Sequence, residues 1–225
     1  MLQSPIAEDG KKLRVAALIS GRGSNMIALA NATADPSFPA SISLVVSNDP
    51  AAGGLAKAGE LGISTLSLPH GPFQGDREAH ERSIDTALVE HDIDLVCLAG
   101  YMRLLSPWLV NRWHNRMINI HPSLLPSFKG LRTHERAIEI GVRWHGCTVH
   151  FVRESMDEGP IIAQAVVPVM AGDTADGLGT RVLKVEHQLY PHALNLVASG
   201  KVRASGDEVI DTPFDAPSSA ANPSF

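Results

Sequence analysis

The sequence predicts an α/β fold, in which a mostly parallel, twisted sheet carries helices on both faces. Three observations support this prediction. Short apolar runs alternate with stretches of helical character through the first half of the chain. These runs are rich in Val, Ile and Leu, as expected of strands that are buried on both faces. Toward the C-terminal end, an alternating pattern from Trp144 to Val169 predicts an antiparallel hairpin instead of a further crossover.

The first predicted elements surround a glycine-rich turn. The apolar run at 13–20 is a buried strand that leads directly into this turn, Ser20–Asn25. The helical stretch after the turn ends at Asp35-Pro36, because a residue that precedes proline disfavours helical backbone. The next elements are, in order, a strand at 42–48, a short helix closed by Gly62 and a strand at 63–69.

The middle of the chain adds a longer helix and more strands. Ile84, Ala87 and Leu88 recur at helical spacing between Asp76 and His91. Right-handed crossovers between parallel strands bring their carboxyl ends to one edge of the sheet, where ligands usually bind. The remaining predicted elements are strands at 94–102 and 117–123, the hairpin at 144–169 and a long helix at 177–200.

The 225 residues suit a single globular domain. We expect this domain at 13–204, with a flexible N-terminal extension at 1–12 and a disordered tail at 205–225 that is rich in Ser, Pro, Asp and Ala. The net charge of −5 disfavours a nucleic-acid partner. Since no apolar run approaches ~18 residues and no secretory pattern is present, we expect a cytoplasmic protein with no membrane partner.

The two cysteines give no sign of a metal site. Cys97 and Cys147 lie in separate apolar stretches, without the CxxC or Cys/His spacing that binds zinc. We therefore expect buried free thiols in a reducing compartment and no bound metal.

The glycine-rich turn, Ser20–Asn25, is a candidate phosphate site. A turn that opens a helix presents free backbone N–H groups, and the helix dipole also favours an anion there. A P-loop is excluded because no Gly-Lys-Ser/Thr follows. A dinucleotide fingerprint lacks its third glycine, where Met26 stands, although Asp49 lies near the end of the second strand. A tight turn with a helix capped by Ser24 would give the same pattern.

The segment at 118–130 is the most informative for chemistry. Asn119 and His121 lie two residues apart in a predicted strand and therefore on one face. Pro122 lacks a backbone donor and would end the strand, which places His121 at its carboxyl edge. Asn119 can donate to an oxyanion, and His121 can donate a proton or stabilise the anion as a cation. A buried histidine bonded to a backbone carbonyl is the alternative.

A carboxylate could complete this pair. Asp157 lies in the turn Met156–Pro160, ahead of the second hairpin strand. Contact with Asp157 would favour the charged imidazolium of His121. The neighbouring Glu158 is a rival for this role, and a solvated turn residue is the simpler alternative.

The string Asn119–Pro126, NIHPSLLP, resembles the signature of the folate-dependent formyltransferases. That superfamily also includes methionyl-tRNA formyltransferases and formyltetrahydrofolate hydrolases. SGRGSN at 20–25, and Glu186-His187 followed by Tyr190-Pro191, resemble the phosphoribosylglycinamide formyltransferases specifically. The resemblance covers about residues 13–200, with the motifs in the same order.

This resemblance implies a Rossmann-like formyltransferase fold and an activity. The formyl group of 10-formyltetrahydrofolate, a co-substrate, would move to the amine of 5′-phosphoribosylglycinamide in purine biosynthesis. The amine would attack directly, through a tetrahedral intermediate and without a metal. Both partners are small molecules, and the protein would be a monomer or a homodimer.

The resemblance also implies roles for individual residues. Asn119, His121 and Asp157 would be catalytic. The ribonucleotide would be bound by Gly23, Ser24, Asn25 and Glu186, with the first three at its phosphate and Glu186 at its ribose hydroxyls. The expected folate-binding residues are Arg77, Met102, Arg103, Leu104, Leu105, Asn119, Arg153, Glu154, Ser155, Met156 and Asp157. Outside the family, the two arginines at 77 and 103 would be ordinary surface charges, and the apolar residues at 102, 104 and 105 would be core.

One residue departs from the family pattern. Leu183 stands where the family often has a polar or basic residue near the phosphate, and Lys184 points about 100° away on the same helix. Phosphate affinity would then depend more on the glycine-rich turn. Three alternatives stay open: a formyltetrahydrofolate hydrolase, a nucleotide-binding module without catalysis, and an NAD-linked dehydrogenase, which the missing third glycine disfavours.

Overall fold

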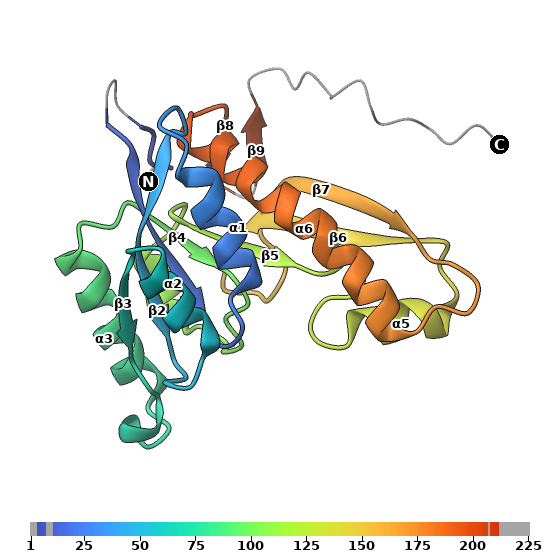
Figure 1. Ribbon diagram of the computed structural model, residues 1–225, viewed down its shortest axis with the longest axis horizontal. Helices are drawn as coiled ribbons and strands as arrows, with labels where there is room; N and C mark the ends of the chain where they lie inside the picture. The colour runs from blue at the N-terminus through green and yellow to red at the C-terminus, as the bar shows by residue number, and fades with distance from the viewer. Residues whose placement is uncertain (1–3, 8–10, 207, 212–225) are drawn as a thin grey trace.

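A central sheet organises the molecule (Figure 1). The computed structural model describes residues 4–7, 11–206 and 208–211. β1 to β5 pair in parallel, whereas β6 pairs antiparallel with both β5 and β7. The predicted fold, a mostly parallel sheet with a C-terminal hairpin, is thus confirmed. In spatial order, the sheet comprises β3 (Ser64–Ser67), β2 (Ala40–Ser47), β1 (Leu13–Ile19), β4 (Leu95–Leu98), β5 (Met117–His121), β6 (Trp144–Phe151) and β7 (Ile161–Pro168).

Helices cover both faces of this sheet, as predicted. The alternation of side chains along β1 shows how the two faces are filled. Val15, Ala17 and Ile19 join one hydrophobic cluster and Ala16 and Leu18 the other, because successive side chains of a strand point to opposite faces. The first cluster is covered by four helices: α1 (Ser24–Thr33), α2 (Gly53–Glu60), α5 (Thr133–Ile140) and α6 (Ala175–Ala198). The second cluster is covered by α3 (Arg77–Glu90) and α4 (Pro107–Arg112). A short 3-10 helix, η1 (Gly71–Phe73), precedes α3.

Tyr190 ties α6 to the middle of the sheet. Its ring is fully buried, and its hydroxyl lies 3.1 Å from the carbonyl oxygens of both Leu98 and Ile118. Burial raises the pKa of Tyr190 well above its ordinary value, so the hydroxyl keeps its proton for these carbonyls. The bond fixes α6 against β4 and β5, the two strands whose carboxyl ends border the candidate site.

Two short helices were not predicted. α4 begins after Ser106, whose hydroxyl accepts from Leu109 N, and α5 ends at Gly141 in left-handed backbone. Helices of six and eight residues contain too few turns to show a clear apolar period. The strands predicted at 63–69, 94–102 and 117–123 were too long, the middle one most of all. There, β4 ends at Leu98, and the chain turns at Gly100, with φ of 81°.

The chain ends pack against each other where they are described. Ala7 N donates to the Ala198 carbonyl (2.9 Å), and Ala204 N donates to Ser4 Oγ (3.3 Å). A second sheet pairs β8 (Val202–Ser205) with β9 (Glu208–Asp211). The predicted domain boundary at 204/205 thus falls inside β8, and the expected tail begins as a strand. Residues 207 and 212–225 of that tail, and residues 1–3 and 8–10 of the expected extension, lie outside the described residues.

The two cysteines are buried free thiols, as predicted. Burial raises the pKa of Cys97 and of Cys147 to about 12. Both side chains therefore remain protonated near neutral pH and act as small apolar core residues.

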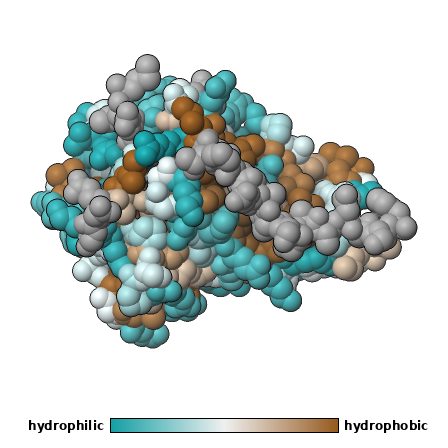
Figure 2. Space-filling view, turned by 90° about the horizontal axis from the view of Figure 1, so that it is seen from above, coloured by the Kyte–Doolittle hydropathy of each residue, from teal (hydrophilic) through white to brown (hydrophobic). Residues whose placement is uncertain are grey.

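The molecule narrows toward the end that β6, β7, α5 and the start of α6 form (Figure 1). Ile140, Trp144 and Val166 are exposed apolar residues of this end. The space-filling view shows brown hydrophobic patches here, interrupted by hydrophilic side chains (Figure 2). No helix in the described parts of the chain is both long and apolar enough to cross a membrane.

Candidate active site

His121 lies at the carboxyl end of β5, with both ring nitrogens facing oxygen acceptors. Nδ1 is 3.4 Å from Asp157 Oδ2, and Nε2 is 3.0 Å from the Phe128 carbonyl oxygen. The side chains of His121 and Asp157 are only 7% and 9% exposed, so this contact is largely shielded from water. Only an imidazolium carries a proton on each nitrogen. The arrangement therefore suits a positively charged His121.

The backbone at Asp157 directs its carboxylate inward. Asp157 has φ of 58°, in the left-handed region that aspartate tolerates better than most residues. Its Oδ2 also accepts from Gly130 N at 2.8 Å. The rival Glu158 is half-exposed and pairs with Lys129 Nζ (2.6 Å), which lowers the pKa of Glu158. The structure thus brings Asp157, and not Glu158, to His121.

Asn119 is positioned by a residue that the sequence analysis missed. His150 lies opposite Asn119 in the β5–β6 ladder, and its Nε2 is 3.2 Å from Asn119 Nδ2. His150 Nδ1 lies 2.9 Å from the Phe151 carbonyl and so carries the proton, which leaves Nε2 as the acceptor. Burial lowers the pKa of His150, consistent with a neutral ring. In the sequence, the histidine within the apolar run CTVHFV indicated a buried polar side chain. Its contact with Asn119 could be predicted only from the pairing of β5 with β6.

The loop after β5 is anchored on the hairpin. Thr148 Oγ1 donates to the Ser123 carbonyl (2.7 Å) and accepts from Leu125 N (3.0 Å). Gln164 Nε2 donates to the Leu125 carbonyl at 2.9 Å, beside the cis Leu125–Pro126 bond. These contacts hold the loop that presents the Phe128 carbonyl to His121.

The glycine-rich turn packs tightly against the start of α2. Gly23 has φ of 71°, and a Cβ built on it would lie 2.9 Å from Gly54 Cα. Gly54 N donates to the Gly21 carbonyl at 3.0 Å. Gly23 is the N-cap residue of α1, and no side-chain hydrogen bond from the described residues caps the helix, so the alternative interpretation with a cap from Ser24 is not observed. The first N–H groups of α1 thus have no helical partner.

A cavity of about 190 Å³ opens beside this turn. The turn 20–25 forms one wall, and Ala99, Gly100 and Met102 of the loop after β4 form the other. The cavity thus lies at the carboxyl ends of the neighbouring parallel strands β1 and β4, where α/β folds usually bind ligands.

Asn25 and Glu186 meet beside the turn, from α1 and α6. Asn25 Nδ2 donates to Glu186 Oε2 at 2.8 Å, and both residues are buried. Burial raises the pKa of the Glu186 carboxyl, while the Asn25 hydrogen bond opposes this. Asn25 Oδ1 is also buried and has no hydrogen-bond partner among the described residues. Two polar groups are thus ready to bind further hydroxyl or amine donors.

These features agree with the similarity to known proteins. Residues 13–194 match the model of the formyl transferase family. The chain belongs to this family. It is 41% identical over 191 residues to the phosphoribosylglycinamide formyltransferase of Escherichia coli, an alignment that covers 85% of this chain and 90% of that protein. The resemblance predicted from the motifs is thus confirmed.

Two other relatives of the formyl transferase chain add detail. The chain is 52% identical over 193 residues to the human trifunctional purine biosynthetic protein adenosine-3. That alignment covers 86% of this chain but only 19% of the human protein. This chain therefore spans about a fifth of that relative. The crystal structure of the Brucella melitensis phosphoribosylglycinamide formyltransferase is 54% identical, with a TM-score of 0.79 over 82% of this chain and 95% of that chain.

The expected folate-binding residues of this formyl transferase lie in three places. Arg77 is exposed at the start of α3. In the loop after β4, Met102 and Leu104 are 68% and 58% exposed, so they are not core residues. Arg103 and Leu105 of the same loop are partly buried.

The third place, the loop after β6, is bound partly to the protein itself. Arg153 donates to Asn115 Oδ1 (2.8 Å) and to the Gly206 carbonyl (2.7 Å), and Glu154 accepts from Asn111 Nδ2 (2.7 Å). The next two residues, Ser155 and Met156, are exposed. The side chains at 153 and 154 thus hold this loop in place, and its tip is open to solvent.

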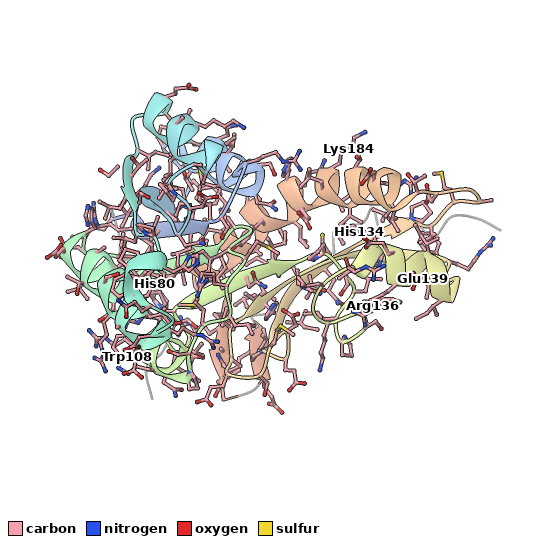
Figure 3. The ribbon with its side chains drawn as sticks, turned by 90° about the horizontal axis from the view of Figure 1, so that it is seen from below. His80, Trp108, His134, Arg136, Glu139 and Lys184 are labelled. Atoms are coloured by element: carbon pink, nitrogen blue, oxygen red, sulfur yellow. The ribbon has the colours of Figure 1, made fainter. Side chains whose placement is uncertain are left out.

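Beside the glycine-rich turn, a basic side chain comes from α2 rather than from position 183 of α6. Leu183 is partly buried, and Lys184 is exposed on the outer side of α6, away from the sheet (Figure 3). Lys57 Nζ donates to the carbonyl of Arg22 in the turn, at 3.3 Å. Within the described residues, no group of three side chains could hold a metal ion.

Proposed function

We propose that the chain transfers the formyl group of 10-formyltetrahydrofolate to the amine of 5′-phosphoribosylglycinamide, a step of purine biosynthesis. The observation that carries this proposal is the buried contact between His121 and Asp157, with Asn119 on the same strand. The names of the relatives in Escherichia coli and Brucella melitensis support the acceptor. We assign the catalytic domain to residues 13–204 extended by the β8–β9 pair, in a cytoplasmic monomer or homodimer.

The reaction begins when the amine nitrogen attacks the formyl carbon. A new C–N bond forms and the formyl oxygen becomes an anion. One N–H of the Asn119 amide remains hydrogen-bonded to His150 Nε2, and the other donates to this oxyanion. The oxyanion replaces the Phe128 carbonyl as the acceptor of the His121 Nε2 proton, and Asp157 holds Nδ1.

The tetrahedral intermediate then collapses. The carbonyl re-forms, and the bond between the formyl carbon and N10 of the folate breaks. The attacking amine loses one proton and N10 gains one, so the transfer balances without an added reactant. A water molecule beside Asp157 carries this proton.

The ribonucleotide occupies the cavity beside the glycine-rich turn. Free N–H groups of Gly23, Ser24 and Asn25 bind its phosphate, and Arg22 and Lys57 add positive charge on that side. Glu186 accepts from the ribose hydroxyls, which suits a carboxylate that is buried and already oriented by Asn25. Because Leu183 carries no charge, binding of the phosphate depends mainly on the glycine-rich turn.

The folate lies along the loops after β4 and β6. Exposed Met102 and Leu104 offer apolar contacts to its ring systems, and Leu105 supports them from the core side. Arg77 and Arg103 pair with its carboxylates. Backbone groups of the loop 153–157 bind the pterin, since the side chains of its first two residues are engaged within the protein.

A coupled absorbance assay tests this function. It follows the release of deformylated folate from 10-formyltetrahydrofolate, with and without phosphoribosylglycinamide. Release only in the presence of the ribonucleotide supports the transferase. Equal release without it indicates a formyltetrahydrofolate hydrolase. No release from folded protein indicates a binding module or another acceptor.

A further inference from the structure

One hydroxyl joins the ends of three neighbouring strands. Ser20 directly follows β1, and its Oγ donates to Oδ1 of Asn48, the first residue after β2, at 2.5 Å. The same Oγ accepts from the backbone N–H of Met102, in the loop after β4, at 2.8 Å. Asn48 therefore fixes the hydroxyl rotor, and the oriented hydroxyl holds the Met102 amide.

The backbone leads Met102 to this hydroxyl. The β1–β4 ladder continues past the strands, because Ala99 N donates to the Leu18 carbonyl and Ser20 N to the Gly100 carbonyl. Gly100 then turns the chain in left-handed backbone, with φ of 81°. Two residues after Gly100, the backbone N–H of Met102 returns to the end of β1 and donates to Ser20 Oγ.

The two segments that meet at Ser20 have different assigned partners. The glycine-rich turn follows Ser20 on the chain, and its residues 23–25 bind the ribonucleotide in the proposed function. Met102 begins the segment 102–105, which binds the folate. The turn and Met102 both line the 190 Å³ cavity, so the placement of Met102 relative to the turn sets the distance between the two bound substrates.

We propose that Ser20 is a positioning residue that holds the ribonucleotide turn and the folate loop in register. The inference rests on the proposed function, and it adds a residue to which no role in the reaction was assigned above. Direct transfer needs the amine and the formyl carbon within a few tenths of an ångström of attack geometry. Each substrate can bind its own segment without Ser20, but the two reacting atoms then meet less often.

Hydrogen exchange at the Met102 amide tests the contact itself. Ser20→Ala is expected to speed this exchange by about tenfold or more, since one hydrogen bond is removed. Asn48→Ala, which frees the rotor from the other side, is expected to act in the same direction. Ser83→Ala is the matched control, because among the described residues the Ser83 hydroxyl bonds the His80 carbonyl within its own helix, α3. Unchanged exchange in Ser20→Ala would overturn the inference, whatever the activity.

Steady-state kinetics test the role in the reaction. With both substrates saturating, Ser20→Ala is expected to lower kcat by about tenfold to 100-fold, with each KM changed less than threefold, in the order-of-magnitude range of a misplaced substrate. Ser20→Thr, which keeps the hydroxyl, should recover most of the loss. Normal kcat in Ser20→Ala, or an equal loss in Ser83→Ala, would contradict the proposal. If the wild-type protein transfers no formyl group, the proposed function fails, and the exchange at Met102 still decides the contact.

Discussion

His150 accepts a hydrogen bond from the side-chain amide of Asn119, directly across the β5–β6 ladder. The Asn119 amide has two N–H groups, and this bond fixes the direction of the second. A buried, neutral histidine is well suited to the task, because its Nδ1 proton is occupied by the Phe151 carbonyl. In the proposed reaction, His150 does not touch the substrate but aims the group that does.

His150→Leu is expected to lower kcat by about 10- to 100-fold, because the Asn119 amide loses its orientation. The KM for either substrate should change little. In an Asn119→Ala background, the same substitution should cost almost nothing further, since the group that it orients is already absent. Fully multiplicative losses in the double variant would contradict this positioning role.

Asp157→Asn and Glu158→Gln make a matched pair of neighbouring acids. Asp157 contacts His121, so Asp157→Asn should lower kcat by about tenfold or more. Glu158 is paired with Lys129 at the surface, so Glu158→Gln should leave kcat near the wild-type value. The measurement is kcat for the three proteins under one set of conditions. The assignment fails if Glu158→Gln lowers kcat and Asp157→Asn does not.

Glu186→Gln should separate stability from binding. Burial raises the folded-state pKa of Glu186 above its ordinary value of 4.5, so the native protein binds more protons than the unfolded chain between the two pKa values. This contribution to stability is present below pH 4.5 and is lost as pH rises through the folded-state pKa. Glu186→Gln removes the charge and keeps an oxygen for Asn25.

The Glu186→Gln variant should therefore have a higher Tm than wild type at pH 7, and about the same Tm in acid below pH 4.5. Its affinity for phosphoribosylglycinamide should fall by about tenfold, since a charged acceptor for the ribose hydroxyls is lost. Thermal melts across pH and titration calorimetry measure the two effects. A lower Tm together with unchanged affinity would contradict the assigned environment and role.

Gly23→Ala should damage the ribonucleotide site, with Gly21→Ala as its control. A Cβ at position 23 meets Gly54 Cα at 2.9 Å in left-handed backbone, whereas one at position 21 has no described atom within 4 Å. We expect Gly23→Ala to raise the KM for the ribonucleotide by about tenfold or more and to lower Tm, since the left-handed strain alone costs about 1–2 kcal/mol. Equal effects from the two substitutions would show that the close approach is unimportant.

The sequence predicts the parts of the site that depend on one strand or one turn. The period of two in β5 puts Asn119 and His121 on one face, and Pro122 ends that strand where expected. The resemblance also assigned Asn25 and Glu186 to the same ligand, and the two side chains are hydrogen-bonded to each other. Contacts between distant elements were harder to predict. The choice between Asp157 and Glu158 depends on one left-handed residue, and the role of His150 depends on the β5–β6 register.

Burial was also hard to predict in the loop after β4. The apolar residues of DLVCLAGYM suggest a strand through residue 102, but the chain turns at Gly100 and exposes Met102. A glycine in an apolar run does not reveal whether it bends the chain. The short helices α4 and α5 escaped prediction because their ends depend on local caps rather than on a repeated apolar pattern.

The central claim is that Asn119 and His121 promote direct formyl transfer, and tracing the formyl carbon in a single turnover tests it most directly. Enzyme in excess would be mixed with phosphoribosylglycinamide and with 10-formyltetrahydrofolate labelled with carbon-13 in the formyl group, and quenched over time. The label should pass to the ribonucleotide amine without appearing on the protein or as formate. Asn119→Ala and His121→Ala should each slow this step by about 10²- to 10³-fold while remaining folded. Label released as formate would show that the transfer is not direct, and transfer at the wild-type rate in either variant would rule out the roles assigned to Asn119 and His121.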